Sequence, residues 1–374
     1  MIINISRNEL LDNISNIQNI TSKKTSIAIL SNILIDSVDD HIVITATDLE
    51  VCVKTKISAD VIENGSITIP SRKFFEMVRE INDEFIHIEV LENKWITVST
   101  NYGNYKLSGI DSDEYPSIPN FNNNVLSLIS SSIISEAIDK TLFSIAQEND
   151  NQFNLMGVLF EKEIRNNKNY VRFVSSDGHR LSFFEKELDT DVDNLIVDRN
   201  ILIPKKGMLE VRKLCDCTDF IEVGFEENQA IFKSENTCIY IRLLNGEFPN
   251  YRNMLKSINR SYCIEIDRNI FISSMKRINI FTEDLYNSVN FDFSANLLVL
   301  SSQNVDIGSA KEKININYTG DNMVLGFNGK YFIDPLQVMN SDKINAYINN
   351  ERSPCLIEGN DDPGFMSIIM PMKI

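Results

Sequence analysis

The chain has 374 residues, with 36 lysine and arginine residues against 53 aspartate and glutamate residues, and a formal net charge of −17. This acidic balance argues against a protein that wraps nucleic acid by bulk positive charge, and it favours a soluble protein. No secretory signal opens the chain, and no apolar run approaches the ~20 residues that span a bilayer. We therefore expect a cytoplasmic protein with no membrane association.

The first third of the sequence predicts a domain that mixes helices and strands. Residues 2–5 form a strand pattern, and Ser6 with Glu9 three residues later matches a capping box at a helix start. Apolar residues then recur at helical spacing over residues 10–17. Short strand patterns follow, and Pro70 opens a second helix that carries basic residues. Two helices among many strands indicate an α+β domain.

The other two thirds repeat this plan. The patterns predict helices over residues 132–145, 205–215, 268–279 and 331–339, with short strands between them and a last strand-like run over 366–374. Turn-rich stretches separate the thirds. We expect three domains, 1–124, 125–260 and 261–374.

Two turns in the sequence echo each other. Asp177-Gly178 joins the strand-like runs 170–174 and 182–184, which is a strong hairpin signal because both turn residues tolerate positive φ. Asp48 lies between two further strand-like runs in the same way. On its own, the Asp177 segment is most simply a tight turn.

The spacing of these features indicates repeated domains. Asp177 lies 129 positions after Asp48, and Pro204 lies 134 positions after Pro70. A fainter third copy places Asn328 another 124 positions after Pro204. A period this long is typical of domain repeats and not of a solenoid of small units.

The sequence shows little that is typical of an enzyme. It contains no phosphate-binding loop and no nucleophile elbow. Its three histidines lack a second ligand at metal-binding spacing, and its six cysteines are scattered, so we expect no cofactor, no metal site and reduced thiols. Acidic clusters at 111–114, 189–193 and 361–362 fit solvated loops. An enzyme that uses Asp177 and His179 stays open as one alternative, and a protein-only scaffold that binds short peptides is another.

Basic residues gather on the repeated helices although the chain is acidic. Lysines on one solvated helix face are common, but the same bias on several repeated helices is less expected by chance. If the repeats surround an axis, these helices would face a common centre and attract phosphates without reading bases. The residues concerned are Arg72, Lys73, Arg79, Lys205, Lys206, Arg212, Lys213, Lys276 and Arg277, with Lys23 and Lys24 after the first helix.

Six segments, taken together and in order, resemble the bacterial sliding clamp family, the beta subunit of the replicative DNA polymerase III holoenzyme. Each motif alone is weak, but the six lie at matching spacing along the whole chain. They are residues 45–50, 69–75, 176–181, 203–207, 246–251 and 370–374.

The resemblance implies an α+β fold of three repeated clamp-type domains, each with two helices packed on antiparallel sheets. Two chains would form a head-to-tail homodimer, a six-domain ring with the helices lining the hole. Such a ring encircles double-stranded DNA without base specificity and tethers the polymerase for processive synthesis, with no catalytic activity of its own. Matched positions that approach the duplex are Lys24, Asn149 and Gln152.

The resemblance also implies an apolar cleft between the second and third domains. It would bind short linear motifs of the DNA polymerase III catalytic subunit, the clamp loader and other replication and repair proteins. Methionine and leucine walls suit such a site because they repack around different peptides. The matched residues are Leu155, Ser176, Gly178, His179, Arg180, Leu181, Pro249, Met254, Tyr331, Ile368, Ile369, Met370, Pro371 and Met372.

Some positions depart from the family pattern. Asn253 stands where many relatives carry a basic residue, and Lys373 replaces the more usual arginine. The matched dimer contact joins Tyr105 and Leu107 of one chain to Ile280 and Phe281 of the other. In relatives, a basic residue at the position of Lys73 faces an acidic run, which here is residues 306–312 with few acids. The sequence therefore leaves the strength of the ionic contacts in the dimer open.

Overall fold

The computed structural model describes residues 1–21, 27–117, 126–147, 152–190, 192, 195–197, 199–226, 228–260, 262–283, 287–350 and 352–372. The chain forms two compact units. The first contains Met1–Ser132, Thr190–Ile196 and Leu209–Leu243, and the second contains Ile133–Asp189, Val197–Met208 and Leu244–Ile374. This division cuts the second third of the chain, because its strands are shared between sheets of both units. The domain boundaries 1–124, 125–260 and 261–374 therefore stay a prediction.

One plan occurs twice in each third of the chain: a strand runs directly into a helix, and three antiparallel strands follow. Among the described residues of the first third, one further strand, β5, and two short 3-10 helices, Ala28–Ser31 and Ser112–Glu114, are added to the plan. Its elements are β1 (Ile2–Ser6), α1 (Arg7–Ile17), β2 (Asn32–Val38), β3 (His41–Thr47), β4 (Val51–Ser58), β5 (Asp60–Glu63), β6 (Gly65–Pro70), α2 (Ser71–Glu80), β7 (Phe85–Val90), β8 (Trp95–Ser99) and β9 (Asn104–Ser108).

The second third follows the same order. Its elements are β10 (Ser127–Ser130), α3 (Ser131–Thr141), β11 (Gly157–Arg165), β12 (Lys168–Ser176), β13 (Arg180–Leu188), β14 (Ile201–Pro204), α4 (Lys205–Cys215), β15 (Phe220–Glu226), β16 (Gln229–Lys233) and β17 (Thr237–Arg242). A short helix, α5 (Tyr251–Ser257), comes before the third repeat.

The last third completes the series. Its elements are β18 (Cys263–Asp267), α6 (Arg268–Asn279), β19 (Ser288–Ser294), β20 (Leu297–Asn304), β21 (Gly308–Asn315), β22 (Met323–Asn328), α7 (Gly329–Val338), β23 (Lys343–Tyr347), β24 (Cys355–Gly359) and β25 (Phe365–Ile369). Among the described residues, no helix combines the length and the apolar character that a membrane crossing requires.

The helices begin where strands end, but their caps differ from the sequence prediction. Ser6 is the N-cap of α1, yet its side chain accepts no capping hydrogen bond, so the predicted capping box is wrong. Pro70 is the N-cap of α2 and the last residue of β6, one position before the helical turn in which it was expected. Asp267 and Asn328 do cap α6 and α7 with their side chains. The expected bounds of α6 are confirmed.

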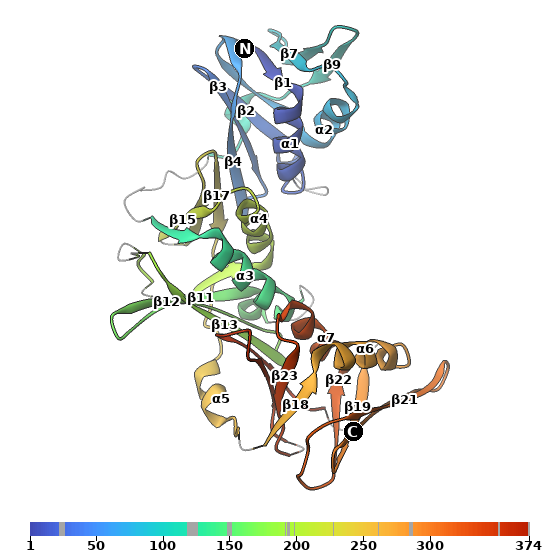
Figure 1. Cartoon of the computed structure of the whole chain (residues 1–374). Helices are drawn as coiled ribbons and strands as arrows, with labels where there is room; N and C mark the ends of the chain where they lie inside the picture. The colour runs from blue at the N-terminus through green and yellow to red at the C-terminus, as the bar shows by residue number, and fades with distance from the viewer. Residues whose placement is uncertain are drawn as a thin grey trace. The chain divides into compact units, whose positions relative to one another are not determined.

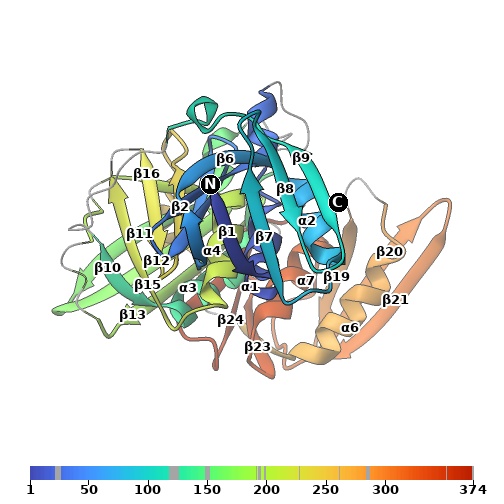
Figure 2. The same ribbon diagram turned by 90° about the horizontal axis from the view of Figure 1, so that it is seen from above.

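The first unit holds two antiparallel sheets. One has the strand order β5-β1-β7-β8-β9, and the other has the order β10-β15-β16-β17-β4-β3-β2-β6. Figure 2 shows β7, β8 and β9 side by side, with β9 at the edge of its sheet. The helices α1 and α2 pack against each other in this unit (Figure 1). Phe74 and Val78, one helical turn apart, form the buried face of α2.

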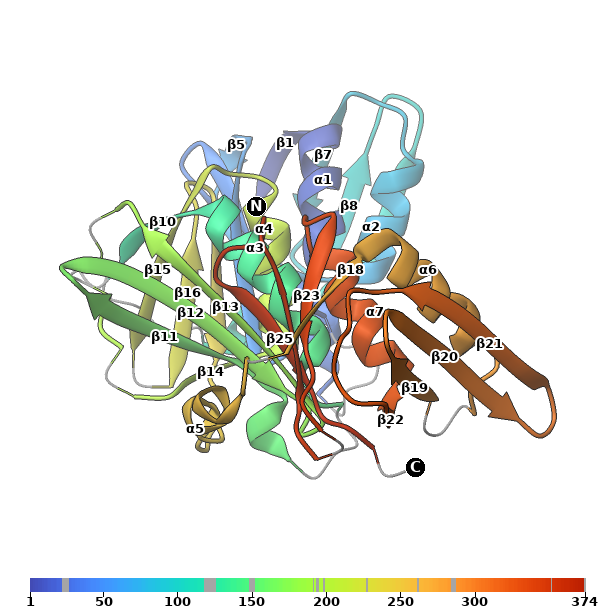
Figure 3. The same cartoon turned by 60° about the horizontal axis from the view of Figure 1, so that its bottom comes forward.

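The second unit also holds two antiparallel sheets, with the strand orders β14-β11-β12-β13-β25-β24-β23-β18 and β21-β20-β19-β22. Figure 3 shows α6 and α7 beside the smaller sheet. Five fully buried phenylalanines fill the space between these helices and the sheet: Phe271, Phe291, Phe293, Phe327 and Phe332. Their rings meet mostly edge to face, as aromatic pairs prefer.

Each eight-stranded sheet crosses from one repeat to the next through one strand pair. We call these pairs the first seam (β4 with β17) and the second seam (β13 with β25). Val51 lies opposite Ile241 at the first seam, and Arg180 lies opposite Ile369 at the second. The repeats are therefore joined by continuous backbone hydrogen bonding as well as by the chain itself.

The similar sequence segments at Asp48 and Asp177 form the same kind of turn. In each third, an Asp or Asn side chain accepts hydrogen bonds from the amides two and three residues later. The distances are 3.0 and 2.8 Å for Asp48, 3.0 and 3.0 Å for Asp177, and 2.9 and 3.2 Å for Asn304. The turn at Asn304 is a third copy that the sequence pattern did not reveal.

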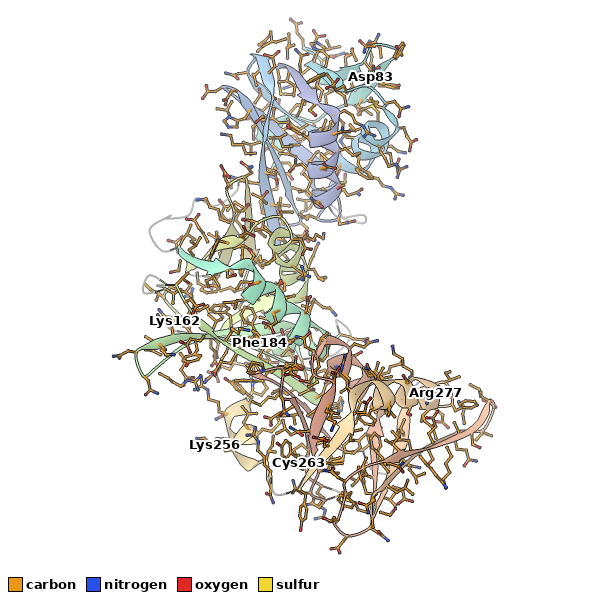
Figure 4. The ribbon with its side chains drawn as sticks, in the orientation of Figure 1. Asp83, Lys162, Phe184, Lys256, Cys263 and Arg277 are labelled. Atoms are coloured by element: carbon orange, nitrogen blue, oxygen red, sulfur yellow. The ribbon has the colours of Figure 1, made fainter. Side chains whose placement is uncertain are left out.

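A buried ion pair ties the second repeat to the third. The Lys140 ammonium lies 3.0 Å from Asp362 Oδ1 and 2.8 Å from Glu136 Oε1, and the side chains of Lys140 and Asp362 are 3% and 0% exposed. The ammonium also lies over the rings of Phe184 and Phe365 at 5.6 and 5.3 Å. In Figure 4, Phe184 is labelled in the interior of the second unit.

Candidate partner-binding cleft and charged surfaces

The turn that carries the predicted cleft residues is fixed by its own side chains. Ser176 Oγ accepts a hydrogen bond from the Gly178 amide at 3.1 Å and donates one to the Arg180 carbonyl at 2.7 Å. Gly178 has φ +85°, a backbone conformation that glycine adopts without strain. The hairpin predicted at Asp177-Gly178 is confirmed, and the turn presents the exposed His179 at its tip.

Arg180 fastens this turn to the third repeat. Its guanidinium lies 3.0 Å from Asp177 Oδ2 and 2.5 Å from Asp334 Oδ2 on α7, and it donates to the Phe143 carbonyl at 2.5 Å. It also lies over the Tyr331 ring, 4.4 Å from the centroid. The side chain is only 10% exposed. Arg180 is therefore a positioning residue whose charge is neutralised within the protein.

The end of the chain continues along the second seam past β25. Ile368 lies opposite Leu181 in that pairing. The Met370 amide then donates to the His179 carbonyl at 2.9 Å, and the Met372 amide donates to the Gly326 carbonyl at 2.8 Å. Met370 is thus held beside the turn, and Met372 is held beside β22.

An apolar cluster lies under these residues. Leu155, Leu181 and Ile368 are buried in one cluster, and Met254 of α5 packs against it. Met370 is 36% exposed, and Pro249 is also exposed. Aliphatic groups therefore form a base, and a flexible methionine lies at the surface above them.

The structure gives no support to Asp177 and His179 as a catalytic pair. Asp177 Oδ1 accepts hydrogen bonds from the backbone amides of His179 and Arg180, and Asp177 Oδ2 is paired with the Arg180 guanidinium. Among the described residues, the His179 imidazole has no hydrogen-bond partner. The carboxylate holds the turn in place instead of orienting the ring.

The basic residues of α2 are exposed but partly neutralised. Arg72 and Lys73 are each 73% exposed, and each lies 3.0 Å from a carboxylate oxygen of Glu76. Hydrogen bonds from Lys73 and Arg72 hold the pKa of Glu76 below its usual value, so this carboxylate is charged at neutral pH. Arg79 is likewise exposed and lies 3.0 Å from Glu80.

The basic residues of α4 follow the same trend. Lys205 is exposed, Lys206 is half-buried, and Arg212 lies 2.5 Å from Asp216. Gln152 is described and exposed. Lys24, Asn149 and Lys373 lie outside the described residues, so the expectations for them stay predictions.

The residues predicted to join two chains lie at sheet edges or next to them. Tyr105 is 42% exposed on β9, and Leu107 on the same strand is half-buried. Ile280 is 64% exposed directly after α6, and Phe281 is half-buried beside it. Glu312 of β21 is paired with Arg277, labelled on α6 in Figure 4, at 2.5 and 2.7 Å.

Three family models match this chain in order. They describe the DNA polymerase III beta subunit: its N-terminal domain matches residues 1–119, its central domain 128–250 and its C-terminal domain 258–373.

Individual proteins are similar over the whole chain. The beta sliding clamp of Chlamydia trachomatis serovar D is 29% identical over 370 residues, which are 99% of this chain and 86% of that one. The beta sliding clamp of Haemophilus influenzae is 28% identical over 379 residues, with 100% of both chains covered. The crystal structure of the DNA polymerase III subunit beta from Pseudomonas aeruginosa superposes with a TM-score of 0.91 at 25% identity, again with 100% of both chains covered.

Proposed function

Because the chain belongs to the bacterial DNA polymerase III beta subunit family, the beta sliding clamps, we propose that two copies close into a ring around double-stranded DNA and hold client proteins in the cleft of the second seam. As a member of this family the chain is a DNA sliding clamp, which acts on DNA and binds the polymerase and other proteins. It is a processivity factor and not an enzyme. The comparisons favour neither the enzyme nor the protein-only scaffold.

The ring proposal is carried by two strand edges. At both seams, the last strand of a first half-repeat pairs with the last strand of a second half-repeat: β4 with β17, and β13 with β25. Two strands of this kind form no seam within the chain: β21, the last strand of the first half of the third repeat, and β9, the last strand of the second half of the first repeat. Each is an edge strand of its sheet. Head-to-tail pairing of β21 with β9 of a second chain would complete the series and cover both edges.

The apolar residues near these edges would form the core of the dimer contact. Tyr105 and Leu107 would meet Ile280 and Phe281 of the other chain. Because Glu312 is already paired with Arg277 in its own chain, the ionic contribution should be small.

Native mass spectrometry tests the ring. We expect a dimer of the 42.7 kDa chain, and we expect the double variant Ile280→Asp, Phe281→Asp to be a monomer. The double variant Ile62→Asp, Phe85→Asp, at two exposed apolar residues outside the proposed contact, is the control and should stay dimeric. A monomeric wild-type protein at micromolar concentration would remove the ring proposal.

The proposed grip on DNA is topological and weak. Arg72 and Lys73 of α2 share the carboxylate of Glu76, and Arg212 of α4 is paired with Asp216 just after the helix, so part of the positive charge on these helices is already neutralised. A chain of net charge −17 would not hold DNA by attraction alone. Lys24, Asn149 and Gln152 are proposed to approach the duplex as well.

Retention on DNA of two topologies tests threading. Protein loaded onto nicked circular DNA by its clamp loader should stay bound during gel filtration, and it should be lost once the circle is linearised. Equal retention on both forms would contradict threading.

For the cleft, we propose that short linear motifs of the DNA polymerase III catalytic subunit, the clamp loader and other replication and repair proteins bind over Leu155, Leu181 and Ile368, beside Met370. The support is the apolar base, the exposed methionine and the fixed turn. Asn253 is exposed, and its neutral side chain cannot form the ion pair with a peptide carboxylate that a basic residue at this position would form.

Deleting residues 370–374 tests the cleft. In fluorescence-anisotropy titrations, the deletion should weaken binding of a client peptide while the dimer stays intact by native mass. Unchanged peptide affinity would remove the assignment. We further propose a cytoplasmic location and the domain boundaries 1–124, 125–260 and 261–374.

A further inference from the structure

The first seam repeats the backbone plan of the second. In both, a hairpin turn built on an aspartate lies against the last residues of a strand from the next repeat. The amide of Arg242 donates to the Glu50 carbonyl at 2.8 Å, and the amide of Met370 donates to the His179 carbonyl at 2.9 Å. Arg242 at the first seam is therefore the structural counterpart of Met370 at the second.

A cavity of about 300 Å³ lies beside this first-seam turn, entirely within the first unit. We call it the first-seam cavity. Pro116 takes part in it, and the Glu-Tyr-Pro segment that ends at Pro116 parallels the Glu-Phe-Pro segment that ends at Pro249. The cavity is lined by Thr47, Leu49, Glu50, Val51, Cys52, Pro116, Ser117, Asn228, Gln229, Tyr240, Ile241 and Arg242.

The side chains of the two seams differ in chemistry. Leu49 replaces Gly178 at the turn, and its side chain is 50% exposed. At the second seam the cation, Arg180, is neutralised by two aspartates. At the first seam the cation is Arg242, which is exposed, and in the described part of the chain its guanidinium has no acidic partner.

Leu49 also has an unusual backbone conformation. Its φ is +76°, where Gly178 has +85°. A non-glycine residue in this region carries a strain of about 1 kcal/mol or more. Glycine at position 49 would relieve the strain, so the turn alone does not explain the leucine. Its exposed side chain on the cavity wall supplies an apolar contact surface.

We propose that the first-seam cavity is a second peptide-binding site, which takes a short extended peptide with an aliphatic side chain next to a carboxylate. The aliphatic group would contact Leu49 and Pro116, and the carboxylate would bind the Arg242 guanidinium. The side-chain amides of Asn228 and Gln229 offer donors and acceptors to the peptide backbone. The site is independent of the cleft at the second seam and would double the number of peptide sites per chain.

Charge decides between a peptide and a nucleic acid as the occupant. Arg242 is the single cation and Glu50 the single acid among the described residues that line the cavity, so the site matches one carboxylate, whereas a phosphate chain with repeated negative charges would need several cations. The small volume also suits a few side chains better than a folded domain.

Fluorescence anisotropy with a defined probe tests the site. The probe is fluorescein-labelled Ala-Leu-Asp-Leu-Ala amide, and the protein is the full dimer with residues 370–374 deleted, which weakens the second-seam cleft. We expect saturable binding of this probe, and at least tenfold weaker binding of the Ala-Leu-Lys-Leu-Ala probe. No saturable binding to the deletion protein would overturn the proposal.

Two substitutions in the deletion protein locate the bound probe. Arg242→Glu should weaken binding at least tenfold, and Arg199→Glu, the same charge change at an exposed arginine outside the cavity, should not change it. Leu49→Gly should weaken binding about fivefold while leaving the urea midpoint unchanged or higher, because it relieves the strain. Equal effects of the two arginine variants, or unchanged binding in Leu49→Gly, would contradict the assignment.

Discussion

Replacing Lys140 by methionine should destabilise the second unit strongly. The substitution keeps most of the side-chain volume but removes the ammonium from a site where it is 3% exposed, and Asp362, with 0% exposure, loses its counter-charge. Breaking a buried ion pair by removing one partner costs about 3–5 kcal/mol. Asp362 keeps hydrogen bonds from the Asn340 and Ser341 amides and from the Ser341 hydroxyl. We therefore expect a loss near the lower limit, about 3 kcal/mol.

Lys186→Met is the matched control for this prediction. Lys186 lies 3.2 Å from the same Glu136 that binds Lys140, but its side chain is 39% exposed. An exposed pair of this kind is worth about 0.2–1 kcal/mol. Urea unfolding followed by circular dichroism should therefore separate the two variants by about 2 kcal/mol or more. Equal losses would refute the view that burial, and not the pairing itself, sets the cost.

Three further predictions concern the second unit. Burial raises the pKa of Asp362, but hydrogen bonds from Asn340, Ser341 and Lys140 outweigh this effect, so the pKa lies below its usual value. The stabilisation by the charged carboxylate is therefore present above about pH 4 and is lost as the pH falls below it. The urea midpoint of the wild type should fall more between pH 5 and pH 3 than that of Asp362→Asn. Gly364→Ala should lower the free energy of unfolding by about 3 kcal/mol or more, because Gly364 has φ +81° and an added Cβ would lie 2.0 Å from the Glu185 carbonyl oxygen. Gly103→Ala is the control and should cost little, because its Cβ would meet only the end of the Tyr105 side chain. Similar thermal midpoints for the two variants would contradict the steric argument. Arg180→Lys should lower the free energy of unfolding by about 2 kcal/mol, because a lysine cannot bridge two carboxylates and a carbonyl. Arg260→Lys is the control at an exposed single ion pair, and it should cost under about 1 kcal/mol in the same urea assay.

The repeat and most of its helices follow from local sequence patterns. Asp48 and Asp177 reveal their shared turn because the carboxylate bonds to amides only two and three residues away. The sequence pattern predicts the bounds of α6, and the structure adds the Asp267 cap at its start. Asn304 makes the same turn with an asparagine in place of the aspartate, so the sequence pattern did not reveal this third copy although the geometry is retained.

The features that the sequence did not reveal depend on residues far apart in the chain. Asp362 lies 222 positions from Lys140, and as one of two adjacent aspartates it looked like part of a solvated loop. That interpretation is wrong for Asp362, which is buried, while Asp361 is exposed. The link from Arg180 to Asp334 spans 154 positions. No local pattern reports such pairings, because each forms only when the seam strands align.

The predicted capping box fails for a related reason. Ser6 and Glu9 have the required spacing, but Ser6 is also the last residue of β1, which pairs with β7. The amide of Arg7, at the start of α1, donates instead to the Glu84 carbonyl at 2.9 Å. A strand that runs directly into a helix can satisfy the helix end through the sheet, and sequence spacing alone does not show this.

The shared sheets have a consequence for how such a chain can be divided or shortened. If the gene were cut at the end of the first repeat, β4 would lose its partner β17, and a cut after the second repeat would do the same to β13 and β25. Each fragment would expose a long strand with unsatisfied amides and carbonyls, a template for aggregation. Because each repeat shares a sheet with a neighbouring repeat, each depends on that neighbour to cover one of its strands. A lineage that lost one repeat would have to recover the missing strand from another polypeptide.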